Sequence, residues 1–337
     1  METALQAGRD TIEAIDSREA LPGSVRRIAA AVRSRLVTRD DPEAIAAGVA
    51  ELGDALLRRV LALAERELGP PPTPFAWLAL GSSGRGEPTP LADQDHLLVH
   101  AAGDEAGNAW FAALAARASD DLAAAGVPRC PGGWMATGWC GTVPEWVERL
   151  QDWAEDGGPE ALLDAAVLMD LRPVAGALDV APLTAAAARL AAHPAVLRGL
   201  VRCALQFRTR GRLALRLHGR RARVDLKAHG LAPLTLLARC WGAEARSPAR
   251  ATAARLEAAR DAGLLEPGPC AAACEAHRVL LGLRLTREAD ALAEDRPAST
   301  ELLLGELDRP RRAQLLDALH AVHELRRIAA FHFRVEA

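Results

Sequence analysis

The sequence of 337 residues contains no tyrosine, and aromatic side chains make up only 4% of it. It also contains a single lysine, Lys227, because every other basic side chain among the 41 Lys and Arg residues is arginine. Acidic and basic residues nearly balance, with a formal net charge of −3. This balance removes any global electrostatic argument for binding nucleic acid or a membrane surface. The single lysine makes that position a candidate for a specific role.

Paired cysteine motifs and long apolar runs are also missing. The six cysteines are scattered, and the only close pair, Cys270 and Cys274, has no second pair nearby. Free buried thiols are therefore expected instead of a zinc site or a disulfide framework. No stretch of about 18 apolar residues is free of charges, and the N-terminus carries acids without an apolar signal core. We therefore expect a soluble, cytoplasmic protein.

The length suits two packed domains. Residues 1–68 are expected to be helical, with a helix beginning at Asp41-Pro42-Glu43. Residues 69–178 predict an α/β region, and residues 179–337 predict a helical domain. Within the α/β region, the apolar runs 75–80, 96–99 and 166–174 predict strands, and 105–125, 144–154 and 159–165 predict helices. The Gly- and Pro-rich stretches 81–92 and 128–141 predict loops.

A glycine-serine stretch and a pair of aspartates flank the first predicted loop. Gly81 and Ser82 open a segment with three glycines in six residues, which lets backbone N–H groups approach a polyphosphate closely. Asp93 and Asp95 are two residues apart at the start of the next strand, so strand alternation places both carboxylates on one face, opposite Gln94. Two adjacent carboxylates suit Mg²⁺, which also takes phosphate oxygens as ligands. A hairpin loop with solvated acids is the alternative, but the conjunction of both features between two apolar strands favours a site.

Phosphoryl or nucleotidyl transfer fits this combination, because such reactions depend on positioning and charge neutralisation. A two-metal site needs a further acid. The best candidate is Asp170, in a predicted strand that could lie beside that of Asp93 and Asp95. Alternatively, Asp170 pairs with Arg172 as a surface ion pair.

At these residues the sequence resembles the DNA polymerase β-like nucleotidyltransferases. It is most similar to a family often fused to CBS and cyclic-nucleotide-binding domains in bacterial signalling proteins, which is related to the PII-protein uridylyltransferase. The likeness extends from about residue 45 to the end of the chain. The segments that carry it are Leu80–Glu87, Asp93–Asp95, Pro131–Ala136, Asp170–Val174 and Asp225–Lys227. Departures from the family pattern are Ser83, Pro88 and His96, and the fused sensory domains are absent.

The resemblance implies an α+β fold, in which a nucleotidyltransferase domain with a small mixed sheet precedes an all-helical, substrate-binding bundle. It implies metal binding by Asp93 and Asp95, phosphate binding by Gly81 and Ser82, and a third metal-binding acid at Asp170. The cofactor would be Mg²⁺, in a two-metal site. The substrate would be a nucleoside triphosphate such as ATP, and the acceptor a hydroxyl of a regulatory protein or a small molecule, in signal transduction.

Three other side chains each allow two interpretations. Arg85 could clamp a phosphate or pair with Glu87 to stiffen the loop. Lys227 could bind a phosphate oxygen or pair with Asp225. Trp134 could stack on a base or anchor its loop in the core.

A basic stretch extends from Arg202 to Lys227, with eight arginines, one lysine and one acid, Asp225. It could bind triphosphate or an acidic partner, or form a solvated helix face.

The sequence thus favours a nucleotidyltransferase as the leading hypothesis. A nucleotide-binding regulatory module with little turnover is the second hypothesis. An RNA-modifying enzyme is a weaker third, because the net charge is acidic.

Overall fold

The computed structural model describes residues 2–38, 40–101, 103–156, 158–207 and 219–336. The helices are α1 Glu2–Glu13, α2 Ser24–Val37, α3 Pro42–Leu68, α4 Gly81–Arg85, α5 Glu105–Ala124, α6 Val143–Asp156, α7 Pro159–Leu168, α8 Ala181–Ala191, α9 Pro194–Gln206, α11 Ala232–Glu244, α12 Thr252–Asp261, α13 Pro267–Ala293 and α14 Arg309–His332. The strands are β1 Phe75–Ala79, β2 His96–His100, β3 Cys140–Thr142, β4 Arg172–Gly176, β5 Arg223–Asp225 and β6 Glu301–Leu303. Short turns of helix occur at η1 Arg18–Ala20, η2 Gly219–Arg221, η3 Lys227–Leu231 and η4 Leu304–Glu306.

The chain forms two compact units. The first comprises residues 1–152, 167–187 and 288–296, and the second comprises residues 153–166, 188–287 and 297–337. The first unit takes in the N-terminal helices, which the sequence suggested as a segment of their own. This mixed organisation, a small sheet with helices followed by a helical region, confirms the expected α+β class.

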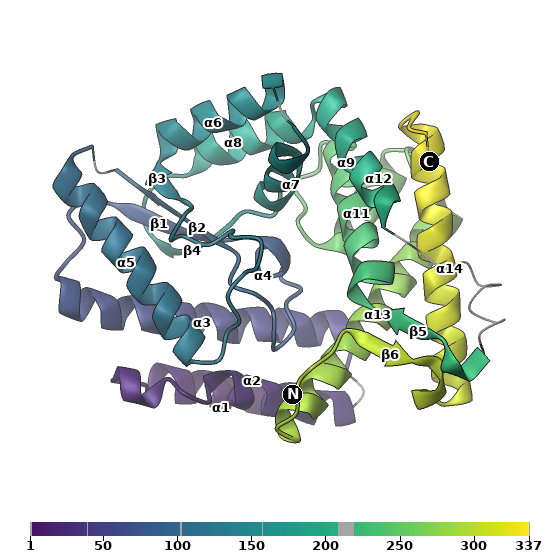
Figure 1. Cartoon of the computed structure of the whole chain (residues 1–337), viewed down its shortest axis with the longest axis horizontal. Coiled ribbons are helices and arrows are strands. Elements are labelled where there is room, and N and C mark those ends of the chain that lie inside the picture. Colours follow the sequence, from purple (N-terminus) through teal and green to yellow (C-terminus); the bar gives the residue numbers. More distant parts are fainter. Residues whose placement is uncertain (1, 39, 102, 157, 208–218, 337) are drawn as a thin grey trace. The chain divides into compact units, whose positions relative to one another are not determined.

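The first unit is built on a four-stranded mixed sheet with the order β3-β2-β1-β4. β1 pairs antiparallel with both β2 and β4, and β2 pairs parallel with β3. All five residues of β1 and all five of β2 are buried, as their continuous apolar runs predicted. Helices α3 and α5 pack on each other and on the sheet, and α1 and α2 pack on α3 (Figure 1). Helix α3 begins where expected, with the Asp41 carboxylate accepting from the Ala44 N–H.

Two expectations about this unit were wrong. Residues 166–168 end helix α7 and the strand begins only at Arg172, because a short apolar run cannot by itself distinguish a buried helix from a strand. The supposed loop after β1 begins with one short helix, α4, although it is glycine-rich. That helix ends in a Schellman arrangement, in which the Glu87 N–H donates to the Ser82 carbonyl (2.9 Å) after left-handed Gly86.

The second unit is helical around α11, which packs against α9, α12 and α14 (Figure 1). Nine of its thirteen residues are buried, so α11 forms the centre of this unit's core. The expectation of an all-helical domain was incomplete, because β5 and β6 form a two-stranded antiparallel sheet. Strands of three residues leave too short an alternation to be recognised in a sequence.

Candidate functional site

The backbone of Gly81 lies directly against the side chain of Asp95. The Leu80 N–H donates to the Asp95 carbonyl (2.9 Å), which extends the β1–β2 pairing beyond the strands. Gly81 has φ +53°, and a Cβ at this position would lie 2.2 Å from Asp95 Oδ2. No other residue fits both the left-handed backbone and the contact. The start of α4 and the second aspartate therefore form one site.

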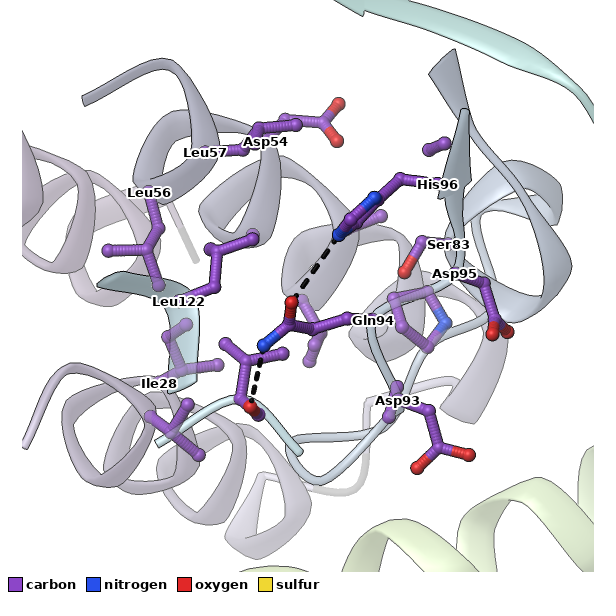
Figure 2. Close-up of a pocket in the computed structure, with 18 of the residues that line it drawn as sticks. Ile28, Asp54, Leu56, Leu57, Ser83, Asp93, Gln94, Asp95, His96 and Leu122 are labelled. Atoms are coloured by element: carbon purple, nitrogen blue, oxygen red, sulfur yellow. Dashed lines mark hydrogen bonds between the residues drawn. The ribbon is translucent and has the colours of Figure 1, made fainter. Parts of the chain in front are cut away.

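Asp93 and Asp95 immediately precede β2 and point to the same side of the chain. Figure 2 shows the intervening Gln94 pointing the opposite way, toward His96. The Gln94 amide is buried and donates to the carbonyls of Ser119 (3.2 Å) and Val127 (3.1 Å). The alternation expected for a strand therefore holds here, and the anchored amide fixes the direction of both carboxylates.

His96 attaches the loop 128–141 to the segment that carries the two aspartates. Its Nδ1 accepts from the Ala136 N–H (2.8 Å), and its backbone N–H donates to the Trp134 carbonyl (2.9 Å). Burial lowers the pKa of His96 to about 3. The ring is therefore neutral, with its proton on Nε2 facing Gln94 Oε1 at 3.4 Å. Trp134 is partly exposed, so its role in base stacking stays a prediction.

Cys130, which sequence reasoning did not connect with the site, lies beside Asp95. Burial, and after it the Asp95 carboxylate, raises the pKa of the Cys130 thiol to about 11. The thiol therefore stays protonated at neutral pH. No local sequence signal joins these two residues, because they meet only when the 128–141 loop folds against β2.

Arg85 is the centre of a buried ion cluster. Its Nε donates to Glu87 Oε2 (2.8 Å) and its Nη1 donates to Asp170 Oδ2 (2.7 Å). Although burial disfavours the charge, these two carboxylates raise the pKa of Arg85 above its usual range. The Arg85 side chain is only 9% exposed, and it makes the loop-stiffening pair with Glu87 and a second pair with Asp170. Its role in phosphate binding stays a prediction.

Asp170 is fully buried in the turn between α7 and β4. Its carbonyl packs on Gly84, where a Cβ would lie 2.2 Å from that oxygen. The suggested pair with Arg172 is replaced by another arrangement. Arg172 donates from Nη1 to Asp54 Oδ2 (2.7 Å) and from Nη2 to Asp54 Oδ1 (2.9 Å), and Nη2 also donates to the Ser83 carbonyl (3.0 Å). Together these contacts attach α4 to α3 and to the turn before β4.

Two carboxylates, and not three, are presented together. Within the part of the chain that the structure describes, no group of three or more His, Cys, Asp or Glu side chains could hold a metal ion. Asp93 and Asp95 alone fit Mg²⁺, because this ion keeps water and substrate phosphate among its ligands. Ser82 follows Gly81, whose backbone packs on the Asp95 side chain. The pair therefore suits a metal that arrives with a triphosphate.

Lys227 belongs to the second unit and is exposed at the start of η3. Asp225 Oδ1 accepts from the backbone N–H groups of Lys227 (2.8 Å) and Ala228 (2.9 Å), so this carboxylate caps the turn. The role of Lys227 in nucleotide binding stays a prediction. Four arginines of the basic stretch, at positions 208, 210, 212 and 216, lie outside the described residues.

Two family models match the chain. A family model described as "Putative nucleotidyltransferase DUF294" matches residues 26–160, and its companion, "Putative nucleotidyltransferase substrate binding domain", matches residues 194–333. The chain belongs to the DUF294 family. The first DUF294 match contains Gly81, Asp93 and Asp95, and the second contains Lys227. No curated protein matches the chain. Among the described helices, none has the length and apolar character needed to cross a membrane.

The contact between Gly81 and Asp95 predicts a large effect of a small substitution. We expect Gly81→Ala to lower the free energy of unfolding by about 3 kcal/mol. The added methyl group would overlap the Asp95 carboxylate, and alanine is strained in the left-handed backbone conformation. Gly86→Ala is the matched control. Gly86 has φ +74°. Apart from its two chain neighbours, no described atom lies within 4 Å of the position that its Cβ would take. The control should therefore lose only about 1 kcal/mol in urea denaturation, and equal losses would contradict the contact.

Proposed function

We propose that this DUF294 chain is a Mg²⁺-dependent nucleotidyltransferase that acts in signalling or regulation. It would move a nucleoside monophosphate from a nucleoside triphosphate, such as ATP, to a hydroxyl group of a protein or a small molecule. The observation that carries the proposal is the packing of Asp95 on Gly81, with Asp93 directed to the same side. The two family matches, which name nucleotidyl transfer and a substrate-binding domain, support it.

Each part of the site has a separate task in this proposal. Asp93 and Asp95 would hold Mg²⁺, which would neutralise charge on the triphosphate. The backbone of Gly81 and Ser82 would donate to phosphate oxygens. The acceptor hydroxyl would give its proton to solvent water and form a new O–P bond to the α-phosphorus, while the bond from that phosphorus to the bridging oxygen would break to release pyrophosphate. Asp170 would act indirectly by holding Arg85 and the turn beneath α4.

A nucleotide-binding regulatory module with little turnover is the second candidate. The engagement of Asp170 by Arg85 favours it, because two-metal catalysis usually draws on a further acid. A module would bind a triphosphate with Mg²⁺ without releasing pyrophosphate.

A labelling experiment separates the two candidates. The protein is incubated with Mg²⁺, a cell extract and each of the four common triphosphates labelled at the α-phosphate. The enzyme transfers label to an acceptor and releases pyrophosphate. Saturable triphosphate binding without label transfer or pyrophosphate release would favour the module, and absence of both binding and transfer would refute the proposed site.

A further inference from the structure

A cavity of about 100 Å³ lies inside the first unit, beneath the segment that carries the two aspartates. Residues of α2, α3, α4, α5 and β1 line it, together with members of the segment 88–96 and Val127. Figure 2 shows its apolar wall, formed by Ile28, Leu56, Leu57 and Leu122, with Gln94 and His96 on the other side. The carboxylates of Asp93 and Asp95 point away from it in this view. Asp93 and Asp95 also belong to its lining, so the cavity adjoins the proposed triphosphate site and lies on the opposite side of the segment from the two carboxylates.

Two buried polar atoms belong to residues that line this cavity. Trp77 is 0% exposed and Thr89 is 2% exposed. Neither Trp77 Nε1 nor Thr89 Oγ1 has a hydrogen-bond partner among the described residues. A buried donor left without an acceptor costs about 1–3 kcal/mol. An acceptor atom bound in the cavity would remove this cost.

A glycine at the rim keeps the cavity accessible. Gly53 lies within α3, lines the cavity and is partly exposed. Apart from its chain neighbours and its own helix backbone, no described atom lies within 4 Å of the position that a Cβ would take. Glycine inside a helix costs about 1 kcal/mol relative to alanine. No close packing requires glycine here, so a larger side chain has room at this partly exposed edge of the cavity lining.

The walls define the chemistry of the occupant. Most of the lining is apolar, and the charged residues that contribute to it, Asp54, Asp93 and Asp95, are all acidic. None of the lining residues is Lys or Arg, so a buried phosphate or carboxylate would find no cationic partner there. The N–H of Trp77 requires an acceptor oxygen, and the apolar wall requires a hydrocarbon body.

We propose that this cavity binds a small, neutral, ring-sized molecule whose carbonyl oxygen accepts from Trp77 Nε1–H and the Thr89 hydroxyl. A water molecule could satisfy these donors but would leave the apolar wall without contacts. The proposal rests on Trp77, Thr89 and the apolar wall and not on nucleotidyl transfer, so it stands or fails independently of the proposed function.

Cyclohexanone is the probe, and methylenecyclohexane, which has the same shape without the oxygen, is its matched control. The full chain is labelled with ¹⁵N-tryptophan, and the indole signal of Trp77 is assigned from its loss in Trp77→Phe. We expect cyclohexanone to shift this signal saturably, and methylenecyclohexane to bind about fivefold more weakly because it forms no hydrogen bond. Absence of a saturable shift would mean that water alone occupies the cavity and would overturn the proposal, as would equal affinity for both probes.

Two variants test the location. Gly53→Leu should fill the rim, abolish cyclohexanone binding and leave the protein at least as resistant to urea as the wild type. Gly268→Leu, at an exposed helical glycine of α13 with open space around it, is the control and should bind normally. Thr89→Val should reduce the preference for cyclohexanone over the hydrocarbon. Normal cyclohexanone binding by a folded Gly53→Leu variant would overturn the proposal.

Discussion

The double substitution Asp93→Asn/Asp95→Asn should reduce nucleotidyl transfer about a thousandfold while the protein remains folded. Asparagine has the same shape as aspartate but lacks the charge that attracts Mg²⁺. The backbone hydrogen bond from Leu80 to the Asp95 carbonyl does not depend on that charge. Stability should be unchanged or slightly greater, because two neighbouring like charges are removed. The rate of label transfer and urea denaturation measure the two effects separately.

Asp120→Asn is the matched control for this experiment. Asp120 lies on α5 in the same unit, and its carboxylate forms an exposed pair with Arg129. Its substitution should leave transfer at the wild-type rate. Transfer that persists in the folded double variant would place the metal elsewhere and refute the role of both aspartates.

Asp170→Asn should lower the free energy of unfolding by about 3–5 kcal/mol, the usual effect of removing one member of a buried ion pair. Asp170 has no exposed surface, and its carboxylate lies 2.7 Å from Arg85 Nη1. Removing the charge leaves Glu87 as the only carboxylate that pairs with the guanidinium in the described cluster. Urea denaturation followed by circular dichroism measures the loss.

Asp261→Asn removes a comparable pair from the surface. Asp261 and Arg260 lie 2.8 Å apart, but both side chains are largely solvated. Solvent screens such a pair, so this variant should be close to wild type in stability. Similar losses in both variants would show that burial of the Arg85 cluster does not determine its contribution.

The sequence predicted those parts of the fold that depend on local pattern. The apolar runs of β1 and β2, the capped start of α3 and the alternation of Asp93, Gln94 and Asp95 are all present. Each depends only on neighbouring residues and their periodicity.

The remaining features depend on residues far apart in the sequence. Arg85 and Asp170 are 85 positions apart, and Arg172 and Asp54 are 118 apart. A single sequence shows that Arg85 has Glu87 nearby, but it does not reveal which distant carboxylate meets the guanidinium. The helix α4 was missed for the same reason, because packing of Gly84 on the Asp170 carbonyl offsets the poor helix propensity of glycine.

The inward anchoring of Gln94 fixes the length of the segment between Asp93 and β2. Adding or deleting one residue there would exchange the two faces, placing a carboxylate among the carbonyls of Ser119 and Val127 and releasing the amide into solvent. Relatives that fold in this way should therefore accept many replacements in the preceding loop, yet no change in spacing between the second acid and the strand. The hydrogen bonds of this buried amide, and not a bound ion, enforce the constraint.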